Sequence, residues 1–478
     1  MSDAVERMSR VDTAWLRMDN DVNLMMIVGV WLLRPAVTLQ AVRERIHDKL
    51  LKYNRFGQKA VADAMGAHWV TDDAFDIARH GVPLTLQRTK GQSERAALQA
   101  VCGELAGTPL DPARPLWQFH LVEDYEDGSA MVCRIHHCIG DGIALTAVMM
   151  SITDGGADPP RRRRKMPSRR SHDHENDWLA DAVIKPLSDL AIKAVGMYGD
   201  GVAKSLEALS SPQQGGMDLA RSGLQVLKDV SAFAAMTDDS PTRLKGQPAG
   251  RKVVAWGDSI PLDEVKAVGK ALGCSVNDVL LACAAGAVGA YLAGKGEDPH
   301  GKEIRAMVPV NLRPLDQAWK LGNRFGLAPL VLPIGTLNPV TRVFAVHARM
   351  AELKGSYQPL LAYAILALTG LFIKPVQDAV LGLFANKTTA VMTNVPGPGV
   401  PLKFCGATLR QSMFWVPCSG GVGVGLSILS YGGGVQFGLI TDSALCPDPD
   451  AIASLFAPEF DKLLALTLML PWGNEQAA

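Results

Sequence analysis

Residues 136–142 read His-His-Cys-Ile-Gly-Asp-Gly, and the segments on either side of them restrict the fold more than any other feature of the chain. The preceding run, Ser129 to Ile135, is mostly hydrophobic and is typical of a buried strand. The following run, Ile143 to Ile152, is predicted to be a helix. Glycine allows a sharp turn between the two and lets a substrate come close. The sequence therefore predicts a strand–turn–helix unit with two adjacent histidines at its turn.

Two interpretations of this histidine pair are open at this point. Imidazole is the side chain best suited to move a proton near neutral pH, so the pair can supply a general base. A histidine at the end of a strand is also often just a hydrogen-bonded residue at the edge of the core. The seven residues alone do not decide between these interpretations.

Length and charge narrow the class of protein. The chain has 478 residues, which is too long for one ordinary domain, so two domains are expected. It is 48% hydrophobic and 20% charged, which is enough apolar material for large cores. Lys plus Arg and Asp plus Glu both number 48, giving no formal net charge. This balance argues against a general nucleic-acid-binding protein, which would carry an excess of basic residues.

Cysteine usage and hydropathy favour a cytoplasmic protein. The eight cysteines are scattered without a Cys-x-x-Cys pair, so we expect neither a zinc site nor a redox motif. The first ten residues are polar and charged, without the apolar core of a signal peptide. The longest apolar run, Leu360 to Ile373, has fourteen residues, whereas a membrane span needs about 20. The longer stretch Leu360 to Phe384 is charged only at Lys374 and Asp378. It is expected to be a pair of core or interdomain helices, to line an apolar tunnel or to rest in a membrane interface.

The hydrophobic patterns on both sides of the chain's midpoint predict mixed α/β structure. In the first third, strands are expected at 23–33, 117–125 and 129–135, and helices at 39–53, 93–105 and 143–152. In the C-terminal half, strands are expected at 252–260, 304–310, 327–332, 424–430 and 435–441, and helices at 262–272, 275–292, 340–353 and 449–466.

A change in composition separates these two parts. Residues 154–176 hold two glycines, three prolines and the basic run Arg161 to Lys165, so they are expected to form an exposed connection. The alternative is that the basic run attracts anionic lipid headgroups or a phosphorylated cofactor. Residues 178–236 are expected to be mostly helical. We therefore predict an N-terminal domain at 1–153, a basic linker with connecting helices at 154–250, and a C-terminal domain at 251–478.

Several short motifs occur in a particular order along the chain. Besides the heptad, they are Met8-Ser9-Arg10-Val11-Asp12, Pro115-Leu116-Trp117, Ser275-Val276-Asn277-Asp278 and Asn394-Val395-Pro396-Gly397-Pro398. Together they resemble the bacterial wax ester synthase/acyl-CoA:diacylglycerol acyltransferase family. That family belongs to the CoA-dependent acyltransferases that are similar to chloramphenicol acetyltransferase and to peptide-synthetase condensation domains.

The resemblance implies both a fold and an activity. The implied fold is α/β, with two chloramphenicol acetyltransferase-like domains facing each other across a tunnel and joined by a helical linker region. The implied reaction transfers a fatty acyl group from acyl-CoA, as cosubstrate, to a long-chain fatty alcohol or a diacylglycerol. No cofactor or metal is expected. Without a membrane span, the expected location is cytoplasmic, with peripheral attachment to a membrane or lipid droplet.

The resemblance also assigns roles within the heptad. His137 is expected to be the general base, because it begins the His-x-x-x-Asp spacing. His136 is expected to orient it or support the fold, with the reverse assignment as the alternative. Asp141 can be the orienting carboxylate of a triad. In the superfamily the equivalent aspartate usually holds a structural ion pair with an arginine, for which Arg313 and Arg305 are both candidates.

The remaining candidate residues bind or orient the substrate. Asn277 is expected near a helix start, either as a donor to the oxyanion or as a cap of its own turn. Gly140 and Gly142 are expected to shape the turn and clear space for the substrate. Cys138 is expected to be an ordinary buried thiol. The cations that would bind the CoA phosphates cannot be assigned from the sequence.

Two other classes of protein stay open as alternatives to the acyltransferase. One is a carrier-dependent module that resembles a condensation domain, although the chain shows no adjoining carrier or adenylation region. The other is a non-catalytic protein that binds lipid droplets, against which the complete heptad argues.

Overall fold

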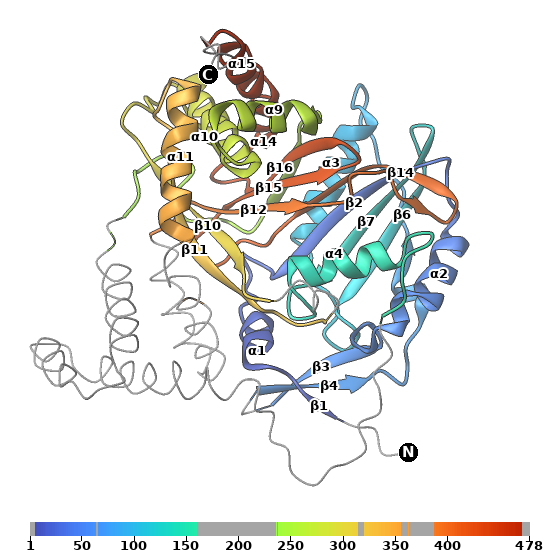
Figure 1. Ribbon diagram of the computed structural model, residues 1–478. Helices are drawn as coiled ribbons and strands as arrows, with labels where there is room; N and C mark the ends of the chain where they lie inside the picture. Colours follow the sequence, from blue (N-terminus) through green and yellow to red (C-terminus); the bar gives the residue numbers. More distant parts are fainter. Residues whose placement is uncertain are drawn as a thin grey trace, which may run out of the picture.

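A computed structural model describes residues 5–63, 66–159, 236, 238–313, 320–354, 362 and 387–470. The basic run Arg161 to Lys165, most of the helical stretch expected at 178–236 and most of the apolar stretch 360–384 lie outside these residues. Two large sheets, each covered by helices, form the described part of the chain, and a small sheet lies beside them (Figure 1). The predicted α/β class with two sheet-rich parts is confirmed.

The first sheet is built around the strand that ends at His136, directly before His137. Its order is β13-β14-β2-β7-β6-β5. These strands span Lys403–Phe404, Ala407–Trp415, Met26–Arg34, Gly128–His136, Trp117–Tyr125 and Gly81–Pro83. Strand β7 runs antiparallel to both of its neighbours, and Met26 of β2 lies opposite His136.

Every residue of β7 is buried, because helices cover both faces of this sheet. Met131, Cys133 and Ile135 pack in the same cluster as residues of α4 (Gly142–Ser151). Ala130 and Val132 pack with residues of α3 (Glu94–Ala106). Burial on both faces explains why 129–135 is a nearly continuous hydrophobic run rather than an alternating one.

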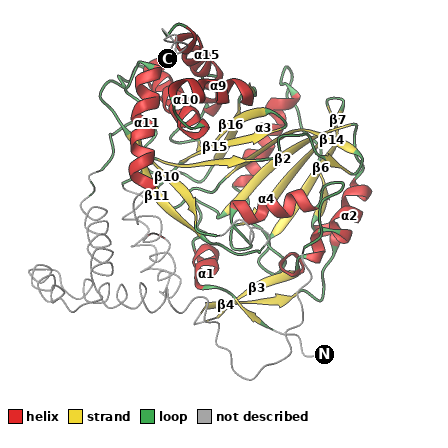
Figure 2. Cartoon of the chain, in the orientation of Figure 1, coloured by secondary structure: helices red, strands yellow, loops and turns green. Residues whose placement is uncertain are grey.

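The second sheet has the order β11-β10-β12-β15-β16-β8, and β9 pairs with β16. These strands span Phe325–Leu332, Ile304–Asn311, Ala390–Pro396, Val424–Tyr431, Gly434–Asp442, Lys252–Trp256 and Ile260–Pro261. Its largest core cluster includes residues of helices α9 (Leu262–Leu272), α10 (Val276–Gly294), α11 (Pro339–Lys354), α14 (Pro449–Ala453) and α15 (Phe456–Leu468) (Figure 2). Among the described residues, α10 alone is long and apolar enough to cross a membrane, but 78% of its most apolar window is buried, as in a core helix.

One strand crosses from the C-terminal part of the chain into the first sheet. Strand β14 pairs antiparallel with β2 and brings Leu409 opposite Leu33. Near its end, Trp415 lies beside Trp256 of the second sheet, with ring centroids 5.6 Å apart. The two sheets are therefore joined in two ways: a strand from the C-terminal part of the chain belongs to the first sheet, and side chains of the two sheets pack together. The predicted division at 1–153, 154–250 and 251–478 stays a prediction.

Most of the expected elements are present, with four differences. The strand expected at 252–260 is two strands, β8 and β9, separated by residues 257–259. The prediction of a single helix at 449–466 is wrong, because this segment forms two helices, α14 and α15. Phe456, the first residue of α15, stacks on Phe437 of β16. Helix α2 (Leu39–Asp48) ends before the expected Tyr53 and is followed by short 3-10 turns. The sequence analysis missed α1 (Arg10–Arg17), β14 and the small sheet of β1 (Glu6–Arg7), β4 (Gly66–Thr71) and β3 (Gln58–Asp63).

Candidate active site

His137 lies immediately after β7, enclosed by aromatic side chains. Its backbone N–H donates to the Met25 carbonyl at 2.7 Å, which continues the contact between β2 and β7. Trp15 of α1 stacks on the imidazole, with ring centroids 4.1 Å apart and planes inclined by 11°. The ring of Phe325 is 5.5 Å away. The imidazole therefore packs against aromatic rings, and the residue is only 5% exposed.

The amide of Asn323 fixes which nitrogen of His137 carries the proton. The Asn323 Nδ2 group donates to Asp12 Oδ1 at 2.8 Å and to the His137 carbonyl at 2.7 Å. Because both of these partners are acceptors, the amide oxygen must face the ring, where it lies 2.8 Å from Nδ1. Nδ1 therefore carries the hydrogen and donates it. Nε2 keeps its lone pair and has no hydrogen-bond partner in the described part of the chain.

Burial keeps this imidazole neutral. Removal from water lowers the pKa of His137 to about 4, although Asp141 and the hydrogen bond to Asn323 act in the opposite direction. A neutral imidazole with a bare Nε2 can accept a proton across the physiological pH range.

Asp12 accepts a hydrogen bond from the amide nitrogen of the Asn323 side chain. Its residue is 1% exposed, and its Oδ1 also accepts the Asn323 backbone N–H at 2.9 Å. Its Oδ2 lies 3.2 Å from Nη1 of Arg55, whose guanidinium stacks on Trp69. Ser9 caps α1 by accepting the Asp12 N–H, which places Asp12 in the first turn of this helix. A chain of contacts therefore runs from Arg55 through Asp12 and Asn323 to His137.

His136 is engaged on both of its ring nitrogens. Nδ1 accepts the Cys138 backbone N–H at 3.1 Å, and Nε2 lies 3.2 Å from Asp19 Oδ1. Burial alone would lower the pKa of His136, but Cys138 and Asp19 more than offset it and raise the pKa. Its backbone N–H donates to the Leu116 carbonyl at 2.9 Å, so the Pro-Leu-Trp segment also supports this residue. These contacts suit a supporting residue better than a free base.

Both carboxylate oxygens of Asp141 make structural contacts. Oδ1 caps α4 by accepting the Ala144 N–H at 2.9 Å. Oδ2 lies 3.0 Å from Nη2 of Arg313 and also accepts the Arg324 backbone N–H at 3.0 Å. Of the two arginines left open by the sequence, Arg313 is therefore the partner. Neither carboxylate oxygen is bonded to the His137 ring, so a role of Asp141 in the reaction itself stays a prediction.

Glycines allow the two parts of the chain to meet at this turn. Gly140 and Gly322 form an isolated β-bridge, and the Gly322 N–H donates to the Ile139 carbonyl at 3.0 Å. Gly322 has a φ of 103°, and a Cβ there would lie 3.3 Å from Asp12 Oδ2. A side chain at position 322 would therefore strain the backbone and push against Asp12.

An apolar cavity lies between the two sheets beside the turn. Its walls come from β2, β7, α4, β14 and β15, and include Ile27, Trp31, Ile135, Leu145, Met413 and Leu429. Gly142 of the heptad and Gly397 and Pro398 of the Asn-Val-Pro-Gly-Pro segment also line it. Such a cavity suits a hydrocarbon chain.

Asn277 and Asn394 connect two of the motifs noted in the sequence. Asn394 Nδ2 of β12 donates to Asn277 Oδ1 in the first turn of α10 at 2.9 Å. The expectation that Asn277 lies at a helix start is confirmed. Its side-chain contact is with another strand rather than with its own turn. Whether its amide nitrogen meets a substrate stays a prediction.

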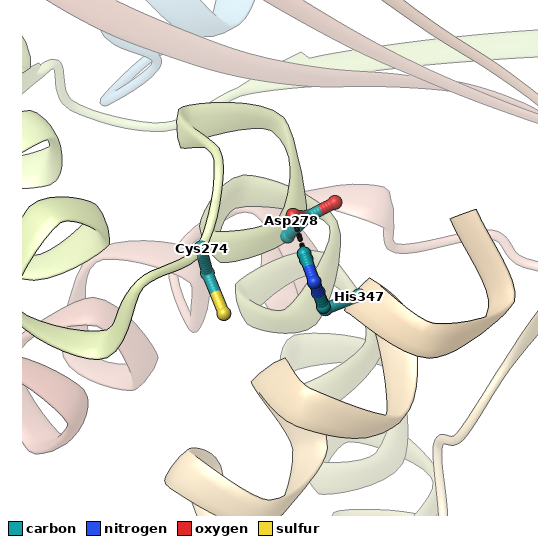
Figure 3. A group of neighbouring side chains, drawn as sticks. All are labelled: Cys274, Asp278 and His347. Atoms are coloured by element: carbon teal, nitrogen blue, oxygen red, sulfur yellow. Dashed lines mark hydrogen bonds and ion pairs between the residues drawn. The ribbon is translucent and has the colours of Figure 1, made fainter. Parts of the chain in front are cut away.

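Cys274, Asp278 and His347 form the one group of metal-ligating types found among the described residues (Figure 3). Their possible ligand atoms lie within 4.8 Å of one another. Asp278 Oδ2 accepts the Ser275 N–H at 2.9 Å and lies 2.8 Å from His347 Nδ1. With Ser275 this makes a complete capping box, so Asp278 orders the start of the helix. The capping role accounts for Asp278 without a metal.

Three residues that contact the His137 ring were not predicted: Trp15, Asn323 and Phe325. Arg55, which pairs with Asp12, was not predicted either. Trp15 and Asp12 lie in or directly after the Met8–Asp12 segment, which was the available signal for α1. Asn323 follows a glycine and precedes a buried strand, which suggests a constrained loop but gives no indication of its partner.

Comparisons with known proteins agree with this architecture. Residues 8–280 match the model of the wax ester synthase/diacylglycerol acyltransferase catalytic domain, and residues 321–464 match that of the WS/DGAT C-terminal domain. A Mycobacterium tuberculosis protein named as a probable diacylglycerol O-acyltransferase is 25% identical over 441 residues, covering 91% of this chain and 89% of its own.

Two solved structures show the same fold at low sequence identity. The wax ester synthase/diacylglycerol acyltransferase from Marinobacter aquaeolei VT8 is similar with a TM-score of 0.65 and 19% identity, over 97% of this chain and 99% of that one. The first condensation domain of the calcium-dependent antibiotic synthetase is similar with a TM-score of 0.56 and 13% identity, over 98% and 97% of the two chains. At these identities the likeness concerns the fold alone.

The buried ion pair between Arg313 and Asp141 yields a stability prediction. Replacing Arg313 with Met leaves the carboxylate of Asp141 buried without its cation, because both side chains are nearly inaccessible to solvent. We expect the free energy of unfolding to fall by roughly 3–5 kcal/mol, measured by chemical denaturation. The matched control is Lys266→Met, which breaks the exposed pair with Asp263 and should change stability by no more than about 0.5 kcal/mol. Equal effects of the two substitutions would contradict a structural role for the buried pair.

Proposed function

The chain belongs to the wax ester synthase/diacylglycerol acyltransferase family and is an O-acyltransferase, and we propose that His137 is its general base. The acyl group comes from a fatty acyl-CoA, and the acceptor is the hydroxyl group of a diacylglycerol or of a long-chain fatty alcohol. The observation that carries this proposal is the bare Nε2 of a buried, neutral imidazole, held at a turn beside an apolar cavity.

The proposed reaction needs no covalent enzyme intermediate. His137 Nε2 removes the hydroxyl proton of the acceptor while the oxygen attacks the thioester carbonyl carbon. The tetrahedral intermediate then collapses, the carbon–sulfur bond breaks, and the imidazolium returns its proton to the departing CoA thiolate. The products are an oxygen ester and free CoA, and the enzyme ends in the protonation state in which it began.

We propose Asn277 as a donor to the oxyanion. Its Oδ1 accepts from Asn394, which leaves its amide nitrogen as the group available to donate. Asn394 lies on β12, and Gly397 and Pro398, which follow that strand, line the apolar cavity. Free backbone N–H groups in the first turn of α10 add to the local positive potential.

We propose that the apolar cavity receives an acyl or alcohol chain. Gly142 begins α4 and lines the cavity, and a Cβ at this position would meet nothing within 4 Å. Gly140 faces the bridge to Gly322 instead of the cavity. The two glycines therefore have different proposed roles: Gly142 leaves room for substrate, and Gly140 allows the two parts of the chain to meet.

We further propose a cytoplasmic protein that attaches to the surface of a membrane or lipid droplet, where its substrates reside. Leu337 and Leu466 line an apolar groove with Ala290 and Ala293 of α10. Leu468 and Met469 follow at the end of α15 and are 72% and 79% exposed. Large apolar side chains gathered at one end of the helical layer suit contact with a lipid surface.

The activity test compares His137→Ala with wild type in CoA release from palmitoyl-CoA, with hexadecanol or dipalmitoylglycerol as acceptor. We expect acceptor-dependent release that falls roughly 10²- to 10⁴-fold in the variant, because the base is lost. The matched control is His120→Ala, since His120 is also buried and burial also lowers its pKa to about 4. It should keep the wild-type kcat. The ratio of the rates with the two acceptors identifies the preferred product.

Other outcomes of this experiment point elsewhere. Release that survives in His137→Ala would transfer the base assignment to His136. No release with either acceptor from the wild type would favour a carrier-dependent condensation reaction or a non-catalytic lipid-binding protein.

The pH dependence follows from the lowered pKa of His137. Only the neutral imidazole can act as base, so kcat/KM falls as the pH drops through the pKa of this group. Because burial lowers that pKa from 6.5 to about 4, we expect nearly constant kcat/KM between pH 6 and 8, with the loss displaced toward pH 4. A half-maximal loss at pH 6.5 in steady-state measurements would show a solvated base instead.

The membrane proposal is tested by flotation with phosphatidylcholine vesicles. Changing Leu468 and Met469 to Glu should weaken partitioning by at least about tenfold, since each buried apolar side chain contributes about 1.5–3 kcal/mol. Val61→Glu is the control, because Val61 is an exposed apolar residue of β3 outside this group. Unchanged flotation of the double variant would exclude this surface as the attachment site.

A further inference from the structure

We propose that Asn323 and Asp12 are positioning residues that fix His137 in its Nδ1–H tautomer and aim Nε2 at the acceptor hydroxyl. This inference rests on the proposed role of His137 as base. It concerns two residues that are 311 positions apart in the chain, neither of which needs to touch the substrate.

Asn323 is suited to this task because its side chain has only one satisfactory orientation. The residue is 6% exposed, so its polar groups must find protein partners. If the amide were reversed, its oxygen would face the Asp12 carboxylate and the His137 carbonyl, which are both acceptors. Its nitrogen would then face Nδ1 and impose the opposite tautomer. The observed orientation satisfies all three contacts and leaves Nε2 as the basic nitrogen.

Asp12 makes that orientation unambiguous. Its Oδ1 accepts both the backbone N–H and the side-chain Nδ2 of Asn323, so it holds the residue at two points. Arg55 offsets the negative charge from the other side, at 3.2 Å from Oδ2. The paired carboxylate therefore orders the amide without placing an uncompensated charge near the imidazole.

The segment that carries Asn323 docks on the histidine turn with four consecutive residues. The Gly322 N–H donates to the Ile139 carbonyl, Asn323 holds His137, the Arg324 N–H donates to Asp141, and the Phe325 ring lies beside the imidazole. This continuous contact fixes the amide relative to the ring. A fixed amide can select a tautomer, whereas a mobile one could not.

Removing the amide should affect kcat much more than KM. Without the amide, the ring keeps only the weaker contact with the backbone of His137 itself. A larger fraction of the neutral ring can then carry its proton on Nε2, and that fraction cannot accept the hydroxyl proton. For Asn323→Leu we expect kcat to fall roughly 10- to 100-fold, as is typical when a group that orients a functional histidine is lost. The KM for palmitoyl-CoA should stay within about twofold. Asp12→Asn, which keeps an acceptor for Asn323 but loses the charge facing Arg55, should show a smaller loss.

A matched control separates positioning from general destabilisation. Asn23 is also a buried asparagine, and its Nδ2 donates to the Gly420 carbonyl at 2.8 Å. Asn23→Leu therefore removes a comparable buried amide away from His137, and it should lower thermal stability while keeping the wild-type kcat.

Two further measurements show whether the effect passes through His137. In the His137→Ala background, Asn323→Leu should cause no additional loss of residual turnover, because there is no imidazole left to orient. Nitrogen-15 NMR of histidine-labelled protein, with the signal assigned by comparison with His137→Ala, should show the Nδ1–H tautomer in the wild type. A mixture of tautomers is expected in Asn323→Leu.

The outcomes distinguish this inference from the proposed function. If His137→Ala is inactive but Asn323→Leu keeps the wild-type kcat, the base assignment stands and the positioning role is wrong. A wild-type NMR signal from the Nε2–H tautomer would overturn the inference directly, even if Asn323→Leu failed to fold. If His137→Ala retains activity, the base assignment on which this inference rests fails, and the acyltransferase activity stands.

Discussion

The structure of this site depends on the docking of Gly322–Phe325 against the turn that follows β7. Through this contact, residues from the C-terminal part of the chain bond to Ile139, His137 and Asp141. The ion pair between Arg313 and Asp141 reinforces it, and Asp141 in turn caps α4. The position of α4, one wall of the apolar cavity, and the orientation of the imidazole are therefore set together. The burial that keeps the His137 imidazole neutral is found at the same contact.

Local pattern was sufficient to predict much of the fold and the turn on which the candidate site lies. Strand β7 is recognisable because burial on both faces requires a nearly unbroken hydrophobic run. The glycines of the heptad indicate a turn, which is present, whereas the cap that Asp141 forms on α4 was not predicted. The sequence also narrowed the partner of Asp141 to two arginines. It could not choose between them, because that choice depends on how two distant segments meet.

Two of the features that were missed, β14 and the contacts of Asn323, depend on contacts between distant parts of the chain. Strand β14 mixes polar and apolar residues, since it joins a sheet edge instead of being buried throughout, and its pairing with β2 has no local signal. Asn323 is unremarkable in sequence, and its side chain contacts Asp12 and His137, which both lie far away in the chain. Hydrophobic periodicity indicates which face of a helix or strand is buried, but it does not indicate which other element packs against that face.

The crossing of β14 into the first sheet has a consequence for how this protein is made. Strand β2 emerges early from the ribosome, whereas the strand that covers its edge is among the last to be synthesised. Until then, the N-terminal sheet presents an unpaired edge that can associate with other chains. Formation of such a distant pairing is also intrinsically slow, because much loop entropy is lost before the contact is gained. The nascent chain should therefore depend on chaperones during synthesis, and fragments that end before residue 407 should aggregate.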